Sequence, residues 1–332
     1  MKKKLLSVLM AAVMVAGVGG VGAAQVKADD EKILGAGIYS ASDNFNSYIG
    51  KAITNACDGI FKTNIEDGQN DQSTQNNQVD TMLAKGASVV AVSVCDVTAA
   101  PTLIQKCKDA GNVPIIFFNK EITDYDVINS YENAYQVTST GGDYGASIQA
   151  QMVIDYWKEH PEMDKNGDGK LQLVYLMGDP GHTASQPRCD YLKSTIEDAG
   201  IEIDLLAEDT GMWVTATAKE KMDAWVSKYG DEIECCVAGN DAMALGALSA
   251  VEAAGFNTDG EESSKYIPIY GIDALPEILS KIESGEITGS VLQDAKTQGQ
   301  TIVKMAENLT SGKDAVDGIE GVETEEEAKA VR

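Results

Sequence analysis

Nine residues from Asp164 to Gln172 have the spacing of a calcium-binding loop. They read DKNGDGKLQ and follow the pattern D-x-[DN]-x-[DN]-G, in which oxygen atoms recur at alternate positions. The expected ligands are the side chains of Asp164, Asn166, Asp168 and Gln172 and the backbone carbonyl of Lys170. Tyr175 stands where an EF-hand has its bidentate Glu, so a complete shell needs a carboxylate from elsewhere. A solvated Asp/Asn/Gly turn is the alternative interpretation.

A second set of chemically capable residues follows the ends of short apolar segments. It includes carboxylates, amides, an imidazole and a guanidinium, which can bond adjacent hydroxyls, and two aromatic rings that could pack on a sugar. The set comprises Asp43, Phe45, Asn119, His182, Arg188, Trp213, Asn240, Asp241, Asp273 and Gln293. Because ligands bind at the carboxyl ends of strands in open α/β sheets, this mixture indicates a site for a neutral polyol.

Each of these residues also has an ordinary structural interpretation. Asp43 and Asp241 could cap the helices that follow them. Phe45 and Trp213 could be core residues, and His182 could lie in a surface loop. The functional interpretation therefore depends on the set converging in space.

The elements that must position these residues alternate between strands and helices, which predicts an α/β fold. The calcium-type loop leads into LQLVYLM, a continuous apolar run typical of a buried parallel strand. The predicted strands are ILGAGIY, VVAVSV, VPIIFF, AYQVT, LQLVYLM, IEIDLLA, IECCVAG, IPIYGI and ITGSVL. Glycines suited to helix C-termini are Gly86, Gly111, Gly200, Gly255 and Gly285.

The alternation predicts two doubly wound parallel-sheet lobes joined by a multi-strand hinge, with a ligand cleft between them. We expect residues 29–120 and 294–313 to form the N-terminal lobe, with a helix from Ala295 to Leu309, and residues 121–293 to form the C-terminal lobe with the calcium loop. Residues 314–332 are acidic and predict a tail without a defined element.

Residues 1–28 have the basic, apolar and small-residue regions of a secretion signal, with cleavage expected near Ala28. A retained membrane anchor is the alternative, since the apolar run approaches a spanning length. Export places the chain in the periplasm or the extracellular cell-envelope space.

The formal net charge is −26, and removal of the four lysines within residues 1–28 makes it −30. Such a charge argues against a nucleic-acid partner. The six cysteines show no CxxC spacing, and the pairing of the cysteines stays open. Two histidines are too few for a histidine-rich metal or catalytic cluster.

Several blocks of the chain closely resemble the periplasmic glucose/galactose-binding proteins of bacterial sugar ABC transporters, in the periplasmic-binding-protein type 1 family. The similarity runs from about Ile33 to Gln300. The blocks are DNFNSYIGKAI, QNDQSTQNNQVDTMLAKG, VPIIFFNKE, DKNGDGKLQLVYL, GDPGH, KMDAWVSK, NDAMALGA and GIDALPE.

The resemblance implies roles for individual residues. Asp43 would accept a hydrogen bond from a ring hydroxyl, and Phe45 and Trp213 would stack on opposite faces of the sugar. The remaining polar contacts would come from Asn119, His182, Arg188, Asn240, Asp273 and Gln293. Glu234 would supply the distant bidentate carboxylate of a structural calcium site.

Three departures from the family pattern stand out. Ala184 replaces an acidic residue near the anomeric hydroxyl, and Gln293 replaces an asparagine. The chain also stops at Arg332, about where the family begins its third crossing between lobes, which suggests a truncated sequence.

The resemblance implies a non-enzymatic monomer that delivers glucose or galactose to a membrane permease, and in some members also engages a chemotaxis receptor. A receptor for another monosaccharide such as a pentose is the main alternative. A glycosidase using Asp43 and Asp273 is disfavoured because neighbouring Asn, Arg and His should keep both carboxylates ionised. The effector half of a repressor is disfavoured because the chain opens with a signal sequence rather than a helix-turn-helix.

Overall fold

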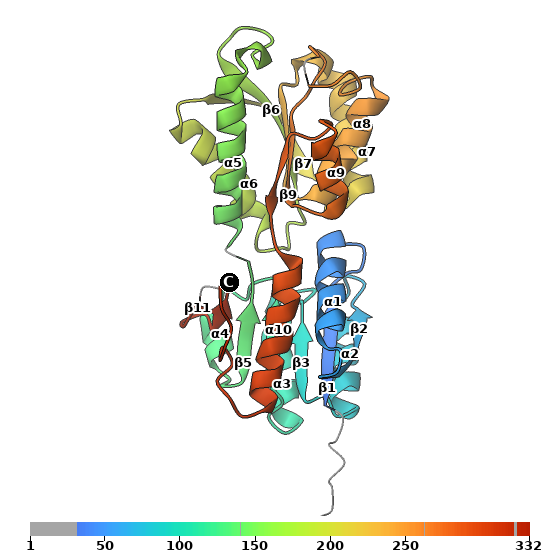
Figure 1. The fold of residues 1–332 in the computed structure, drawn as a ribbon, viewed down its shortest axis with the longest axis vertical. Helices are drawn as coiled ribbons and strands as arrows, with labels where there is room; N and C mark the ends of the chain where they lie inside the picture. Colours follow the sequence, from blue (N-terminus) through green and yellow to red (C-terminus); the bar gives the residue numbers. More distant parts are fainter. Residues whose placement is uncertain (1–31, 140, 262, 322–323) are drawn as a thin grey trace, which may run out of the picture. The chain divides into compact units, whose positions relative to one another are not determined.

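The computed structural model describes residues 32–332 except residues 140, 262 and 322–323. In this part of the chain, strands and helices alternate and build two sheets with helices on both faces of each (Figure 1). The predicted secretion signal lies outside the described residues. The two helix-covered sheets confirm the predicted α/β class.

The first sheet has seven strands in the order β11-β12-β5-β4-β3-β1-β2. Its pairings are parallel except for that of β11 with β12. The strands are β1 (Ile33–Ile38), β2 (Lys62–Asp67), β3 (Val89–Val92), β4 (Ile115–Phe118), β5 (Ala134–Val137), β11 (Thr324–Glu325) and β12 (Ala330–Val331).

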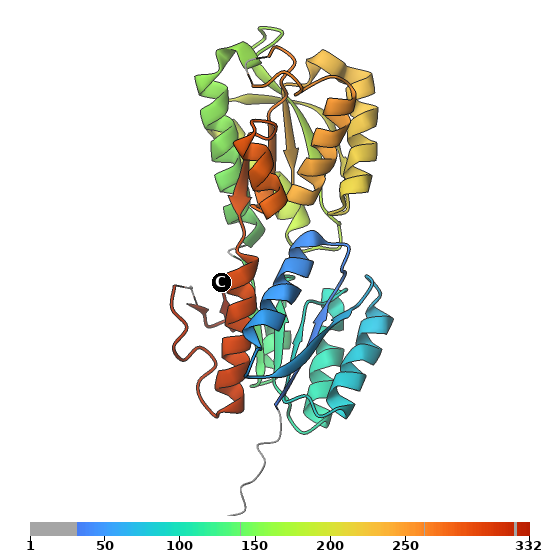
Figure 2. The ribbon, with the colours of Figure 1, turned by 45° about the vertical axis from the view of Figure 1, so that its right-hand side comes forward.

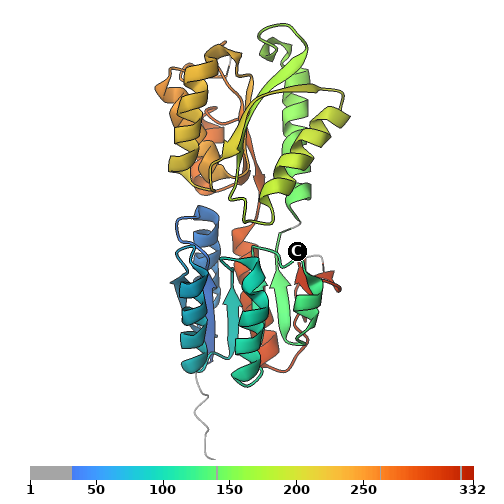
Figure 3. The same ribbon diagram turned by 180° about the vertical axis from the view of Figure 1, so that it is seen from behind.

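Helices cover both faces of the first sheet because successive strand residues point to opposite sides. Leu34 and Ile116 pack towards α1 and α10, which lie side by side in Figure 1. Val90 and Phe117 pack towards α2 and α3 on the face seen in Figure 3. The helices associated with this sheet are α1 (Asn44–Ala56), α2 (Gln72–Ala84), α3 (Ala100–Asp109), α4 (Tyr125–Asn129) and α10 (Ala295–Thr310).

The second sheet has five parallel strands in the order β10-β9-β8-β6-β7. The strands are β6 (Lys170–Met177), β7 (Glu202–Thr210), β8 (Cys235–Ala238), β9 (Ile269–Asp273) and β10 (Gly289–Leu292). The associated helices are α5 (Gly141–Glu159), α6 (Ser185–Asp198), α7 (Thr215–Tyr229), α8 (Asp241–Ala253) and α9 (Pro276–Glu283). Figure 2 shows α5 and α8 on opposite sides of this sheet.

The predicted lobe boundary at residue 120 is wrong. Strand β5 pairs with β4 and β12, so residues up to Val137 belong to the first sheet. The sequence pattern identified this strand correctly, but alternation alone does not determine which sheet a strand joins. The return to the first lobe after β10 occurs as predicted, because α10 packs against α1.

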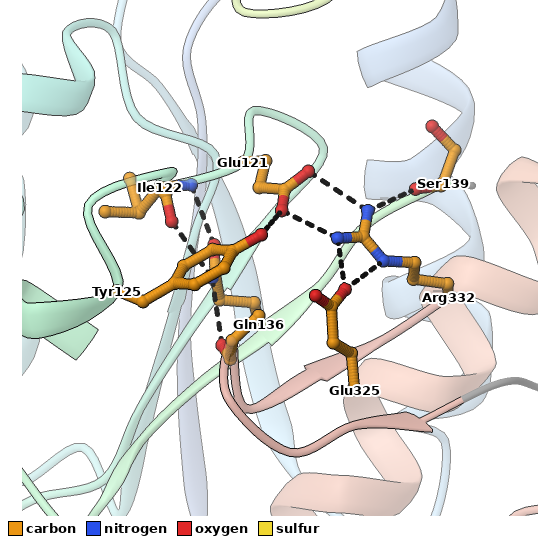
Figure 4. Close-up of polar contacts among 8 residues, drawn as sticks. Glu121, Ile122, Tyr125, Gln136, Ser139, Glu325 and Arg332 are labelled. Carbon is orange, nitrogen blue, oxygen red and sulfur yellow. Dashed lines mark hydrogen bonds and ion pairs between the residues drawn. The ribbon is translucent and has the colours of Figure 1, made fainter. Parts of the chain in front are cut away.

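The acidic tail also differs from expectation, since it contains β11 and β12. Strand β12 extends the first sheet beside β5. Arg332 then donates to the carboxylates of Glu121 and Glu325 at 2.6–3.0 Å and to the carbonyl of Ser139 at 3.3 Å (Figure 4). The charge run is therefore compatible with a docked segment. Besides the backbone pairing and Arg332, Lys329 donates to the carbonyl of Tyr131 at 2.8 Å, and Gln136 donates to the carbonyl of Ala328 at 3.0 Å.

Strand β2 was not predicted from the sequence. It is an edge strand with the sequence KTNIED and only partial burial, so it lacks the apolar run that marked the other strands. The five predicted capping glycines all have positive φ, between 75° and 101°. Among the described residues, no helix is both long and apolar enough to span a bilayer.

Candidate ligand-binding site

The predicted polar residues occupy the carboxyl ends of strands from both sheets. Asp43 follows β1, Asn119 follows β4, and His182 follows β6. Asn240 follows β8, and Asp273 ends β9. Residues of the two sheets meet here, since the ring centroids of Tyr39 and His182 are 6.3 Å apart.

Asp43 is buried and serves two structural roles. Its Oδ1 accepts the backbone N–H of Asn46 at 3.0 Å, which caps α1, and its Oδ2 accepts the hydroxyl of Tyr39. The capping interpretation of Asp43 is therefore correct, and it is compatible with a place in the ligand site. Burial raises the pKa of the Asp43 carboxyl, while the bond from Tyr39 opposes that rise.

Lys120 brings a cation into the same cluster. Its side chain is buried, its Nζ donates to the carbonyl of Cys95 at 2.9 Å, and it lies 4.0 Å from the centroid of the Tyr39 ring. Burial lowers the Lys120 pKa. Sequence reasoning missed Lys120 and Tyr39, although each adjoins a predicted segment: Lys120 follows Asn119, and Tyr39 ends the first predicted strand.

His182 is positioned as a neutral hydrogen-bond donor. Its Nδ1 accepts the backbone N–H of Ala184 at 3.1 Å, which leaves the proton of the neutral ring on Nε2. Burial lowers the pKa of His182 well below its usual value, and the positive charges of Lys120 and Arg188 lower it further. The imidazole therefore presents an N–H group at neutral pH.

Arg188 connects the strand ends of the second sheet. Its Nη1 donates to the carbonyl of Gly239 at 2.6 Å, and its Nη2 donates to Oε1 of Gln293 at 2.7 Å. The guanidinium carbon lies 5.5 Å from the Trp213 ring centroid. The buried Nε has no hydrogen-bond partner, so one donor of the fixed fork is left for another group.

Asp273 lies beside a second buried carboxylate, Asp241. Asp241 accepts the hydroxyl of Ser290 at 2.6 Å and the backbone N–H of Leu275 at 2.8 Å. Asp273 has a buried Oδ2 without a partner. Burial, followed by the neighbouring charge of Asp241, raises the pKa of Asp273 well above its usual value, and burial raises that of Asp241 to about 6.

The cap of α8 is Asn240 rather than Asp241. Its Oδ1 accepts the backbone N–H of Met243 at 3.0 Å. Asp241 is instead the first residue of the helix, and its carboxylate points to other elements. The alternative interpretation of Asp241 as a helix cap is therefore wrong.

Trp213 packs closely against the backbone at two glycines, and only glycine fits at the first of them. A Cβ on Gly178 would lie 1.9 Å from the indole, and one on Gly239 would lie 3.1 Å from it. The Trp213 backbone has φ of 62°, and its Nε1 has no partner. His182 packs edge-on against the ring, with centroids 5.3 Å apart.

Phe45 packs in the hydrophobic core of the first lobe, which supports the core interpretation. It belongs to a buried cluster with Ile49 of α1 and Leu275, which follows β9. Asn119 has φ of 64°, is half-buried and lines a cavity of about 650 Å³. Gln293 borders two further cavities, of about 310 Å³ and 540 Å³, and only the first of these also reaches Arg188.

The predicted calcium loop forms a tight turn closed by its own side chains. Asp164 accepts the backbone N–H groups of Gly167, Asp168 and Gly169 at 2.8–3.1 Å. Asp168 Oδ2 accepts the amide groups of Asn166 at 3.1 Å and Gln172 at 2.9 Å. These contacts are also those of an Asp/Asn/Gly turn, so they do not distinguish the two interpretations.

Glu234 reaches this loop from the start of β8, as the resemblance implied. Its buried carboxylate accepts the backbone N–H of Lys165 at 2.6 Å and that of Gln172 at 3.1 Å. The side-chain oxygen of Gln172 is buried without a partner. Within the described residues, no three His, Cys, Asp or Glu side chains converge as a metal-binding group. A metal here would therefore also need amide and carbonyl oxygens.

Comparison with known proteins identifies the family. Residues 36–314 match the model described as "Periplasmic binding protein domain". The chain belongs to the periplasmic binding protein family. A D-galactose/methyl-galactoside binding periplasmic protein of Haemophilus influenzae is 42% identical over 288 residues, which are 86% of this chain and 83% of the relative.

Two further relatives within this family are more distant. A xylitol-binding protein of Mycolicibacterium smegmatis is 27% identical, over 86% of this chain and 74% of its own length. The crystal structure of an ABC transporter solute binding protein from Bacillus halodurans with bound myo-inositol superposes with a TM-score of 0.72 and 28% identity, over 86% of this chain and 90% of that one. These relatives are binding proteins and not enzymes, in agreement with the prediction for this chain.

Substitution of Gly178 tests the position of Trp213 in this binding protein. Because the added methyl group overlaps the indole, Gly178→Ala should displace Trp213, change its fluorescence and weaken ligand affinity at least tenfold. Gly181→Ala is the matched control, since its Cβ would lie 3.4 Å from Asp179 Oδ1. Equal affinities of the two variants would show that the indole does not contribute to binding.

The raised pKa of Asp241 predicts a pH-dependent stability. Protonated Asp241 persists in the folded chain up to about pH 6, so its stabilising contribution is greatest below pH 4 and is lost as the pH rises through 6. The rise of the Asp241 pKa from 3.8 to about 6 corresponds to a loss of about 3 kcal/mol in the free energy of unfolding once the carboxyl is ionised.

The variant Asp241→Asn should therefore raise the melting temperature more at pH 7.5 than at pH 4.5. An asparagine can still accept from Leu275 and donate to Ser290, so the hydrogen bonds are kept. Asp80→Asn, at an exposed ion pair, serves as the control. A gain of equal size at both pH values would contradict the raised pKa.

Proposed function

We propose that the chain is an exported solute-binding protein that captures galactose or glucose for the membrane permease of an ABC transporter. The observation that carries this proposal is a set of buried, unpartnered polar atoms at the strand ends of the second sheet: Asp273 Oδ2, Arg188 Nε and Trp213 Nε1. The Arg188 guanidinium lies 5.5 Å from the Trp213 ring centroid, and its charge opposes the rise that burial causes in the pKa of Asp273. A sugar offers hydroxyl groups that can both donate and accept, so one molecule can satisfy all three.

The relatives support a neutral ligand. Their names or bound molecules are a galactoside, xylitol and myo-inositol, all uncharged and rich in hydroxyl groups. The 42% identity to the galactoside-binding relative favours a hexose. Export follows from the predicted signal in residues 1–28, and a monomer that also engages a chemotaxis receptor belongs to the same proposal.

The main alternative is another monosaccharide, such as a pentose. Two residues of the site that depart from the family pattern support this alternative. Gln293 accepts from Arg188, so its oxygen is already engaged. Ala184 carries no hydrogen-bonding side chain where the resemblance implies an acid.

The carboxylates do not behave as the sequence suggested. We expected neighbouring residues to keep Asp43 and Asp273 ionised, but burial raises the pKa of both carboxyls. A raised carboxyl pKa is also a property of glycosidase acids. Recovery of unchanged sugar after long incubation would separate binding from hydrolysis.

Titration calorimetry with galactose, glucose, ribose and xylose tests the proposal. We expect heat with at least one hexose, and a loss of about 10- to 100-fold in affinity for Asp273→Asn, because a charged hydrogen bond contributes about 1.5–3 kcal/mol. Lys106→Ala, at an exposed ion pair, should leave affinity unchanged. Heat with a pentose alone would show that the ligand is a pentose instead of a hexose. No heat with any of the four sugars would refute the proposed function.

We further propose that the loop from Asp164 to Gln172 binds a structural calcium ion with Glu234. The buried, unpartnered oxygen of Gln172 and the buried carboxylate of Glu234 support this, since both are oxygen ligands beside the loop. Burial raises the pKa of the Glu234 carboxyl, and a bound cation would favour its ionised form.

Chelation should therefore lower the melting temperature of the protein, and added calcium should restore it. Calcium at 100 times its dissociation constant stabilises the folded state by about 2.7 kcal/mol. Glu234→Gln should abolish the response to EDTA and calcium, whereas Asp223→Asn, at an exposed ion pair, should retain it. Identical melting curves of the parent protein with and without EDTA would count against an occupied site.

A further inference from the structure

A second cavity region borders the ligand site and is not explained by a single monosaccharide. It has a volume of about 650 Å³ and is reached by Asn119 and Ala184, which adjoin the polar cluster. Its volume lies within the range of about 300–1,000 Å³ usual for small-molecule sites. The space is therefore large enough for a small-molecule ligand.

Ala184 forms the border between this cavity and the polar cluster. Its backbone N–H donates to Nδ1 of His182, so the residue directly adjoins the imidazole. Its side chain ends at the methyl group, and Pro187 of the next turn also lines the cavity. A ligand held by His182 thus meets no polar side chain at position 184.

Exposed tyrosine rings line the cavity from two helices. Tyr144 of α5 is 59% exposed and Tyr191 of α6 is 48% exposed, which is unusual for rings of this size. Tyrosine combines an apolar face with a polar hydroxyl. Two such rings in one cavity suit a ligand with apolar C–H faces and hydroxyl edges.

The charged groups that line the cavity are Arg332, Glu121 and the exposed Asp143, and the first two pair with each other (Figure 4). Arg332 is the one cation among the described lining residues, and the carboxylates of Glu121 and Glu325 already neutralise it. Tyr125 also donates its hydroxyl to Glu121 at 3.0 Å. An anionic substituent would find no free positive charge here.

Thr138 supplies an unused hydrogen-bonding group in the same wall. It is buried, its Oγ1 has no partner, and the residue lines the cavity. A buried hydroxyl without a partner costs about 1–3 kcal/mol, so an occupant with hydroxyl groups would relieve that cost.

We propose that this cavity is a second subsite, which holds a neutral sugar ring joined to the hexose in the first site. The ligand class of the protein then extends from monosaccharides to disaccharides. This inference rests on the proposed sugar-binding function. Tyr144 and Tyr191 pack against the second ring, and Thr138 bonds one of its hydroxyls.

Titration calorimetry with two hexoses and four disaccharides tests the proposal. The sugars are galactose, glucose, the galactosyl disaccharides melibiose and lactose, and the glucosyl disaccharides maltose and cellobiose. For whichever hexose binds, we expect at least one of its disaccharides to bind with an affinity within tenfold of the affinity for the hexose itself. Tyr144→Ala and Tyr191→Ala should each lower the affinity for that disaccharide at least fivefold and the affinity for the hexose less than twofold.

Leu279→Ala is the matched control, because this side chain is 46% exposed and does not line the cavity. It should change neither affinity. Hexose binding with all its disaccharides more than tenfold weaker would overturn the second subsite and leave the proposed function intact. Tyrosine variants that weaken hexose and disaccharide equally would also overturn it. Failure of every sugar to bind would instead refute the proposed function itself.

Discussion

Burial of polar atoms without protein partners is the constraint on which the ligand site depends. Asp273 Oδ2, Arg188 Nε and Trp213 Nε1 are all buried and unpaired at the meeting point of strand ends. Each such atom costs about 1–3 kcal/mol, and folded proteins contain few of them. These three atoms belong to side chains at the strand ends of the second sheet, where an outside molecule can complete their hydrogen bonds.

The fold makes this burial possible by holding the same side chains through structural contacts. Asp43 caps α1 with one oxygen and faces Tyr39 with the other, so the helix fixes the carboxylate. Gly178 fixes the indole of Trp213, and Gly271 admits the carboxylate of Asp241, because a Cβ on Gly271 would lie 2.2 Å from Asp241 Oδ1. Preorganisation of this kind reduces the entropy that a ligand must remove on binding.

Sequence patterns predicted most strands and the convergence of polar residues, since buried parallel strands are apolar runs and ligands bind at their carboxyl ends. They did not assign β5 to its sheet, because pairing partners leave no mark on a four-residue strand. The edge strand β2 is too polar to be recognised from an apolar run, and β12, with two residues, is too short. Within the site, Lys120 was missed because the sequence does not show that a lysine is buried. Asp241 was considered as a helix cap because it stands at the start of a helix, where capping residues are common.

The electrostatics of the cluster explain why an uncharged ligand fits it. His182 is neutral at physiological pH, while Lys120 and Arg188 face the carboxyls of Asp43, Asp241 and Asp273. Because the cluster holds groups of both signs, neither an anion nor a cation meets a field of one sign, whereas a neutral hydroxyl can bond to either kind of group. A sugar hydroxyl that donates to Asp273 favours the ionised carboxylate and lowers its raised pKa. Binding of a neutral ligand therefore supplies the missing hydrogen bonds and also offsets the cost of keeping this buried carboxylate charged.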